Sequence, residues 1–471
     1  MIFTPQNYVT LGGHFVVSDT VCAKAHACLG APIMAELWHG FTYRRSALTV
    51  SSADGYCFTV GKTEEVPLQG HAYAVRVTED GISLYADSES SLIMGYMTLL
   101  DRIYAKDGET DDRSPSLAID CCEFRETPLV GRRMVHFCVF PETELWELQK
   151  FIRFCGALKY SHIVLEFWGM LQYDCLKELA WPSAYTKEQV RPLIEEAKAL
   201  GLKVIPMFNH WGHASAGRVI HGKHVVLDQN PSLQTYFSED GWCWDIRKPK
   251  VRALLRSIRR ELCELCGDGE YFHVGCDEAY NFEFTKENMD FICDFLGEIA
   301  DEMKAEGRRI LAWGDMFLYR HAHYNPNNKY ACNAPTPEVE TYLLQNLSRD
   351  IIIADWQYDA TEAPVETALV FRQAGFDTLL CPWDRSDDKL KSCVKTVKDE
   401  QLYGLMHTTW HTLSHGTPFV LMAALGCFQN IEHYKKTPMR TQAAAIMRKV
   451  YFVDGSYEKA GWAKNQIQTI T

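Results

Sequence analysis

The sequence of 471 residues contains no uncharged apolar run approaching the roughly 18 residues that a membrane-spanning helix requires. Its start lacks a basic segment followed by an apolar core, so we expect a cytoplasmic protein. The sequence also lacks an excess of positive charge. It contains 48 Lys and Arg residues and 61 Asp and Glu residues, which gives a net charge of -13. This balance excludes a general nucleic-acid or anionic-membrane partner and favours a small, uncharged ligand.

A disulfide framework is not expected either. The 17 cysteines are odd in number and spread along a long chain, which is typical of reduced thiols packed as small hydrophobic side chains. Cys263 and Cys266 have the spacing of a zinc or redox motif, but they lie in an amphipathic helix expected over 248–266, with no second Cys/His pair nearby. The sequence therefore predicts neither a cofactor nor a structural metal.

The first part of the chain contains short segments of alternating apolar and polar residues. Turn residues separate these segments, as in antiparallel hairpins, at 55–60, 71–77 and 81–86. Residues 90–106 have apolar side chains at helical spacing, and 107–115 form a polar linker rich in helix-breaking residues. We therefore predict a small α+β domain over 1–115.

From about residue 118, apolar strand segments alternate with amphipathic helices. The expected strand segments are 134–140, 162–168, 203–213, 271–278, 308–317, 350–359, 377–384 and 402–410. Helical periodicity between them, as in 144–160 and 186–201, gives eight strand-helix units over about 300 residues, the pattern of a (β/α)8 TIM barrel. We predict an α/β fold in which this barrel occupies 116–435.

Residues 436–471 are predicted to be a C-terminal helical tail packed on the barrel. The apolar helical stretch that begins at 418 has two interpretations. It could complete the outer layer of the barrel, or it could form the contact of a homodimer.

The strand ends are rich in polar and aromatic residues. Barrel active sites form at the carboxyl ends of the strands. The residues there are Glu166, Trp168, Asn209, His210, Trp211, His213, Asp277, Glu278, Trp313, Asp315, Trp356, Tyr358, Asp359, Trp383, Asp384, Trp410 and His411. One tryptophan at a strand end is ordinary packing, but six at six ends suit a neutral sugar, whose CH faces stack on rings while its hydroxyls bind acids and amides.

The segment Tyr271–Glu278 is an apolar run that stops at two adjacent carboxylates. Two acids at the carboxyl end of a parallel strand are suited to catalysis. Alternatively, Asp277 could cap the next helix while Glu278 lies in solvent. The surrounding strand ends favour the catalytic interpretation.

The same segment, His273-Val-Gly-Cys-Asp-Glu278, resembles the H-x-G-G-D-E motif of glycoside hydrolase family 20, the β-N-acetylhexosaminidases, with Cys276 in place of the second glycine. Other segments match in the same order. IPMFNHWGHAS is similar to the family's I-P-E-x-D-x-P-G-H-x motif and places His213 on its histidine, while LAWGDMF and DWQYD resemble its fifth and sixth strands. Residues 71–103 resemble its small N-terminal domain, so the similarity covers about 50–430.

The resemblance implies an exo-acting, retaining β-N-acetylhexosaminidase in which the substrate's own 2-acetamido group is the nucleophile. Glu278 would be the general acid/base, and Asp277 would orient the acetamido N–H and stabilise the oxazolinium-like charge. The substrate-binding residues would be Trp313, Trp356, Tyr358, Asp359 and Trp410, with His213 and Glu166 behind the acids. The expected partner is a small oligosaccharide or glycoside with a terminal N-acetylhexosamine.

Two departures from the family pattern concern the far side of the sugar ring. The family's D-x-x-R arginine has no counterpart between Arg133 and Pro141, and the glutamate of its W-x-E motif is absent after Trp410. N-acetylglucosamine, N-acetylgalactosamine and a modified sugar all stay open as the terminal unit. His136, His411 or Arg385 could replace this arginine and glutamate as sugar-binding residues, here called the clamp residues. A histidine facing a barrel core, however, is more commonly a packing residue.

Two further functions stay open. The absence of the family's arginine and glutamate would also be consistent with a sugar-binding protein on an inactivated barrel. The presence of the two acids argues against this function. A metal-dependent hydrolase could use His210, His213 and Asp277 with His407 or His411, because histidines and acids at strand ends can bind zinc.

Overall fold

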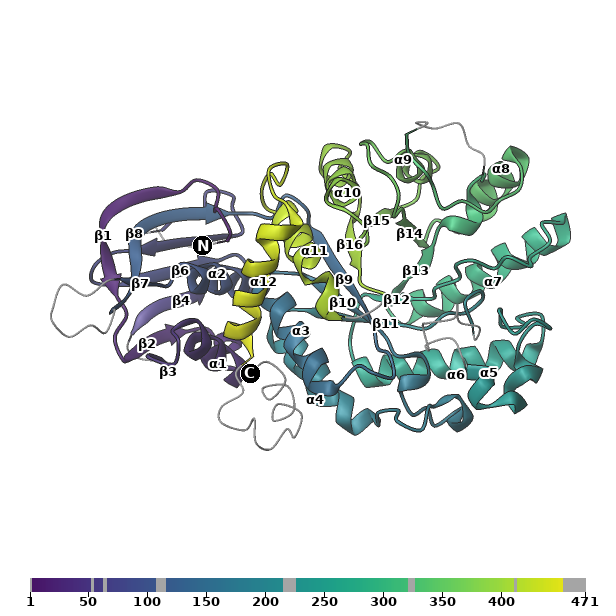
Figure 1. Ribbon diagram of the computed structural model, residues 1–471, viewed down its shortest axis with the longest axis horizontal. Coiled ribbons are helices and arrows are strands. Elements are labelled where there is room, and N and C mark those ends of the chain that lie inside the picture. The colour runs from purple at the N-terminus through teal and green to yellow at the C-terminus, as the bar shows by residue number, and fades with distance from the viewer. Residues whose placement is uncertain are drawn as a thin grey trace, which may run out of the picture. The chain divides into compact units, whose positions relative to one another are not determined.

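The structure is a computed structural model that describes residues 2–51, 55–61, 66–106, 116–214, 226–320, 327–410 and 413–451. The chain forms two compact units (Figure 1). One runs from the N-terminus to Glu126 and also takes in the chain from Thr441, and the other spans Thr127–Arg440.

In its described residues up to Glu126, the first unit contains a mixed β-sheet and two α-helices. The strand order is β1-β8-β5-β6-β4-β2-β3, and β7 pairs with β8. The elements are β1 (Val9–Val16), β2 (Thr20–Ala25), α1 (Pro32–Phe41), β3 (Ala47–Ser51), β4 (Tyr56–Val60), β5 (Tyr73–Val77), β6 (Ile82–Ala86), α2 (Glu89–Asp101), β7 (Tyr104–Lys106) and β8 (Ser116–Glu126). The predicted α+β character is confirmed, including the antiparallel pairing of β5 with β6.

The limits of this unit differ from those predicted from the sequence. The unit extends past residue 115 because β8 pairs along its length with β1, β5 and β7. At the other end, the chain from Thr441 in α12 (Lys436–Val450) groups with this unit, whereas the sequence suggested a tail on the barrel. Near the end of α12, the Lys449 ammonium lies 5.0 Å from the centre of the Phe41 ring.

The second unit is a closed barrel of parallel strands, which confirms the predicted (β/α)8 fold. Its strands are β9 (Arg132–Cys138), β10 (His162–Glu166), β11 (Lys203–Met207), β12 (Tyr271–His273), β13 (Arg309–Trp313), β14 (Ile352–Trp356), β15 (Thr378–Cys381) and β16 (Gly404–Thr408). Its helices in the described ranges include α3 (Leu145–Ala157), α4 (Lys187–Ala199), α5 (Val226–Gln229), α6 (Pro249–Cys266), α7 (Lys286–Ala305), α8 (Pro337–Asn346), α9 (Glu366–Gln373), α10 (Asp387–Asp399) and α11 (Leu413–Gly426). No helix among the described residues is both long enough and apolar enough to cross a membrane.

The barrel interior is filled by alternate residues of its strands. One buried cluster contains Met134, Val164, Ile205, Met207, Tyr271, Leu311, Trp313, Ile352, Ala354, Leu379, Cys381 and Met406. Side chains along a strand point alternately inward and outward, so the positions two residues further along also point inward, at the carboxyl ends. These positions include His136, Glu166 and His273, and Trp356 and Trp410 pack against the cluster.

Candidate active site

The two acids lie on a tight backbone turn just after β12. The strand is shorter than predicted and ends at His273, because Gly275 and Cys276 both adopt left-handed conformations, with φ of 67° and 78°. Glu278 also has a positive φ, 51°. Helix α7 begins only after Thr285, whose hydroxyl accepts the Asn288 N–H at 3.2 Å. Asp277 is therefore not the cap of this helix.

His213, on the loop after β11, bridges the two acids. Its Nδ1 lies 2.7 Å from Asp277 Oδ2, and its Nε2 lies 2.9 Å from Glu278 Oε2. Burial by itself would lower the pKa of His213, but the two carboxylates outweigh it and raise this pKa to about 9. At neutral pH, His213 is therefore an imidazolium that donates one N–H to each acid.

We expect this protonation state to be visible by NMR of the protein with 13C-labelled histidine. The His213 signal should titrate near pH 9, because the cation is stabilised by both acids. Its contribution to stability is complete below the unfolded value of 6.5 and is lost as the pH rises through 9. His273 and His407 serve as internal controls, because burial lowers the pKa of each to about 3. A His213 signal that titrates near pH 6.5 would contradict this assignment.

Asp315 holds the backbone of Glu278 in place. Its Oδ2 accepts the Glu278 backbone N–H at 2.9 Å and the Asn333 amide at 2.7 Å, and its Oδ1 accepts the Trp356 indole N–H at 3.1 Å. Burial, followed by the charge of Asp277, raises the pKa of Asp315 to about 7. The sequence placed Asp315 at a strand end but gave it no role.

The predicted aromatic residues form a continuous wall at the strand ends. Trp313 lies 5.7 Å from Trp410, and Trp356 lies 4.9 Å from Tyr358, measured between ring centres. The Trp410 indole N–H and the Thr408 hydroxyl both donate to the Tyr358 hydroxyl oxygen. The carboxyl ends of three strands, β13, β14 and β16, thus contribute to one wall.

Glu166 pairs with His136 below this wall. Their Oε2 and Nε2 atoms are 3.1 Å apart, and both side chains are buried. The His136 ring lies 4.8 Å from Trp410 and 6.1 Å from Trp313. The sequence predicted that His213 and Glu166 both lie behind the acids. His213 contacts both acids, whereas Glu166 is hydrogen-bonded to His136.

Comparison with known proteins identifies this barrel. Residues 168–386 match the family described as "Glycosyl hydrolase family 20, catalytic domain". This part of the barrel is therefore similar to a glycosyl hydrolase family 20 catalytic domain. The match includes Asp277, Glu278 and most of the aromatic wall, and it confirms the resemblance seen in the sequence.

Relatives of known sequence are distant. A β-hexosaminidase of Porphyromonas gingivalis is 21% identical over 301 residues, which are 56% of this chain and 38% of that protein. A lacto-N-biosidase of Bifidobacterium bifidum is 22% identical over 240 residues, 46% of this chain and 18% of that protein. The chain therefore spans well under half the length of these relatives.

Solved structures share the fold over nearly the whole chain. The family 20 exo-β-N-acetylglucosaminidase of Vibrio harveyi, in complex with N-acetylglucosamine, superposes with a TM-score of 0.68 at 16% identity, covering 96% of this chain and 77% of that one. The Streptomyces plicatus N-acetyl-β-hexosaminidase, in complex with Thio-NAglucal, gives 0.66 at 16% identity, covering 98% and 95%. The sheet unit and the barrel are thus both found in family 20 structures.

One predicted site residue lies at the rim of the barrel. The Asp359 side chain is about half exposed and forms an ion pair with Lys389 of α10. Among the alternative clamp residues, the Arg385 guanidinium lies 4.2 Å from the centre of the Trp383 ring, and His411 lies outside the described residues.

The side chains that could hold a metal ion differ from those predicted. His213, Asp277 and Glu278 place their ligand atoms within 4.8 Å of one another. His210 does not belong to this group, because its Nδ1 hydrogen-bonds the Phe208 carbonyl oxygen at 2.6 Å and its ring lies 5.8 Å from Phe272. The group offers one imidazole and two carboxylates, and protonated His213 donates one N–H to each carboxylate.

Trp242 is a site residue that the sequence analysis missed. Its indole N–H donates to the Glu278 backbone carbonyl oxygen at 2.5 Å, and its ring lies 4.7 Å from His213. The Tyr280 ring stacks on Trp242 with 5.9 Å between the ring centres. Trp242 lies in the long irregular loop after β11, where no sequence periodicity indicates which side chains face the acids.

Gly212 allows this loop to approach the acids. A Cβ atom at this position would lie 2.0 Å from the Asp277 carbonyl oxygen and 2.8 Å from the Ala279 nitrogen. We expect Gly212→Ala to lower the free energy of unfolding by about 2 kcal/mol, because only backbone atoms could move aside. Urea unfolding measures the effect.

The matched control for this prediction is Gly297→Ala in α7, where an added Cβ meets no atom within 4 Å. We expect this variant to be up to about 1 kcal/mol more stable than the wild type. A Gly212→Ala variant as stable as the wild type would show that the close approach is wrong.

Proposed function

We propose that this protein is an exo-acting, retaining β-N-acetylhexosaminidase that releases terminal β-linked N-acetylglucosamine or N-acetylgalactosamine. The observation that carries the proposal is the pairing of Asp277 and Glu278 through His213, beside the wall of Trp313, Tyr358 and Trp410. The Vibrio harveyi neighbour, whose structure contains N-acetylglucosamine, supports the choice of sugar.

Glu278 acts as the general acid and then as the general base. The form of Glu278 that acts as the acid is the protonated one, whose Oε2 can still accept from His213. In the first step, this proton passes to the glycosidic oxygen as the bond from that oxygen to the anomeric carbon breaks. The substrate's acetamido oxygen attacks this carbon and forms a cyclic oxazolinium ion. In the second step, the Glu278 carboxylate takes a proton from water, and the water oxygen opens the ring with overall retention. His213 Nε2, 2.9 Å away, keeps the carboxyl group oriented throughout.

Asp277 provides an acceptor for the acetamido N–H. Its Oδ2 is engaged by His213, whereas its Oδ1 is buried and has no hydrogen-bond partner in the described part of the chain. A buried acceptor of this kind favours a ligand donor, because an unsatisfied carboxylate oxygen is costly. The negative charge also stabilises the oxazolinium ion, which is positive.

Tyr358 provides the donor for the acetamido carbonyl oxygen. Its hydroxyl oxygen accepts from Trp410 and Thr408, so the hydroxyl proton is left to donate. Burial raises the pKa of Tyr358 well above its usual range, so the proton is retained at all physiological pH values. Trp313 and Trp410 then enclose the acetamido methyl group and the sugar ring.

The proposal is tested with aryl β-glycosides of N-acetylglucosamine, N-acetylgalactosamine and glucose. We expect cleavage of an acetamido sugar, inhibition by a thiazoline mimic of the cyclic intermediate, and no comparable cleavage of the glucoside. Equal cleavage of the glucoside would contradict acetamido participation. Activity lost in EDTA and restored by zinc would instead favour the metal-dependent hydrolase, and binding of these sugars without cleavage would favour the sugar-binding protein.

A further inference from the structure

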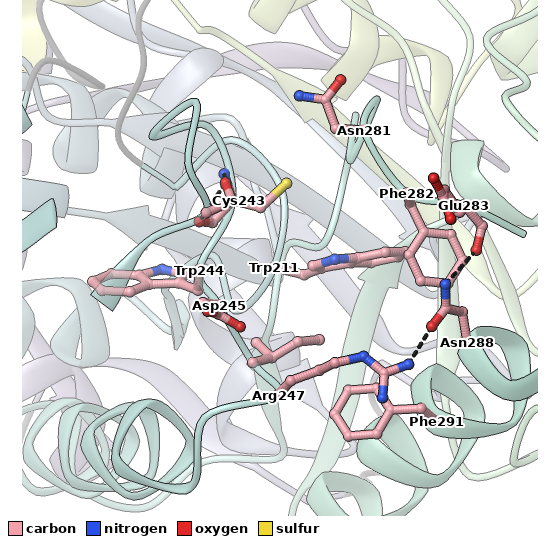
Figure 2. A pocket seen from close by; sticks show the side chains of 12 residues that line it. Trp211, Cys243, Trp244, Asp245, Arg247, Asn281, Phe282, Glu283, Asn288 and Phe291 are labelled. Carbon is pink, nitrogen blue, oxygen red and sulfur yellow. Dashed lines mark hydrogen bonds between the residues drawn. The ribbon is translucent and has the colours of Figure 1, made fainter. Parts of the chain in front are cut away.

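A pocket of about 310 Å³ opens beside the segment that follows the catalytic acids (Figure 2). It lies between the loop that precedes α6 and the start of α7. Its volume is within the range of about 300–1,000 Å³ found for small-ligand sites. None of the residues proposed for catalysis lines it.

The pocket is connected to the catalytic acids through two short segments. In the first, Trp242 contacts His213 and the Glu278 backbone, and the next residue, Cys243, lines the pocket. In the second, Tyr280 stacks on Trp242 and is 50% exposed, and Asn281 and Phe282 line the pocket. An aromatic surface therefore leads from His213 outward to the pocket.

The walls of the pocket combine aromatic faces with hydrogen-bonding groups. Trp211 and Phe282 meet edge to face at 4.7 Å, and Phe291 lies across from them (Figure 2). The Arg247 guanidinium lies 4.6 Å from the centre of the Phe291 ring and hydrogen-bonds Asn288. Such a combination suits a sugar ring, which has apolar CH faces and polar edges.

The charges of the lining nearly cancel. The lining contains two carboxylates, Asp245 and Glu283, and one guanidinium, Arg247. Asp245 is also paired with Lys248 at 2.8 Å, and Arg247 with Glu287 at 3.5 Å. An anionic ligand would meet the carboxylates, and a cationic ligand would meet Arg247. A neutral hydroxyl-rich ligand can accept from the guanidinium and donate to the Glu283 carboxylate at the same site.

We propose that this pocket binds a neutral sugar unit of the leaving group, beyond the unit joined to the cleaved bond. This inference rests on the proposed function, since it assigns the far end of the same substrate. The leaving oligosaccharide crosses Trp242 and Tyr280 and places a later unit against Phe282, Phe291 and Arg247. Longer neutral oligosaccharides are therefore better substrates than disaccharides.

The test compares kcat/KM for chitotetraose with kcat/KM for chitobiose, whose leaving groups contain three sugar units and one. We expect the ratio of the two constants to fall by about tenfold in Arg247→Ala, and to fall also in Glu283→Gln, because hydrogen bonds to charged groups are lost. The matched controls are Arg260→Ala and Glu264→Gln, exposed positions on α6 outside the pocket, for which the ratio should stay at the wild-type value.

Isothermal titration with chitotriose keeps the two proposals separate when every variant also carries Glu278→Gln, because binding is then measured without turnover. Weaker binding of chitotriose by Arg247→Ala than by Arg260→Ala supports the pocket assignment, even if no aryl glycoside is cleaved and the proposed function fails. An unchanged ratio together with unchanged chitotriose binding overturns it, even if the aryl glycosides are cleaved.

Discussion

Replacing Glu278 with glutamine is expected to lower kcat/KM for 4-nitrophenyl β-N-acetylglucosaminide by about a thousandfold, since the variant has no proton to give or take. The side chain keeps its size and can still accept from His213 Nε2, which lies 2.9 Å from Oε2 in the wild type. The backbone bonds from Asp315 and Trp242 are also independent of the side chain. The loss should therefore reflect chemistry and not misfolding.

Two comparisons establish the role of Glu278 as an acid. A dinitrophenyl leaving group needs less protonation, so its first step should be much less affected in Glu278→Gln than that of the nitrophenyl substrate. Glu264→Gln, at an exposed position of α6, should retain wild-type activity. Equal losses for the two leaving groups would show that Glu278 has a role other than proton donation.

Replacing Asp277 with asparagine is expected to lower kcat for the same substrate by about a hundredfold with a smaller change in KM, because it removes transition-state stabilisation. The carboxylate oxygen Oδ1, which is buried and has no partner among the described residues, would become part of a neutral amide. The variant could no longer stabilise the positive charge of the cyclic intermediate.

The same variant has a second readout in the histidine spectrum. Asp277 contributes more than Glu278 to raising the pKa of His213 against burial, so this pKa should fall in Asp277→Asn. Asp268→Asn, at an exposed site before β12, is the control for both measurements. If kcat falls while the His213 signal still titrates near pH 9, the contact between Asp277 and His213 is wrong.

Local sequence patterns were sufficient to predict the barrel. Each strand-helix unit is encoded within a few dozen residues, and capping residues such as Thr186 and Gln189 mark a helix start that the structure confirms. The limits of the first unit could not be predicted in this way. The segment that forms β8 has the pattern of a strand, but its pairing with β1 and β5 depends on residues far away in the chain.

In the site, too, local sequence patterns predicted some residues, whereas contacts between residues far apart in the chain could not be predicted. Asp277, Glu278, His213 and the aromatic wall were predicted because each lies at the end of a recognisable strand. Trp242 and the role of Asp315 were not, because their contacts with Glu278 join positions 36 and 37 residues apart in the chain. The partner of Glu166 was likewise not predictable, because His136 lies on the neighbouring strand.

The two hydrogen bonds to the backbone of Glu278 have a consequence for engineering. Its peptide N–H is fixed by Asp315 and its carbonyl oxygen by Trp242, while its own φ of 51° is one that side-chain-bearing residues seldom adopt. The orientation of this glutamate is therefore imposed by two other loops. Transplanting residues 273–278 alone into another barrel would carry the acids but not their geometry, and a functional graft would need all three loops.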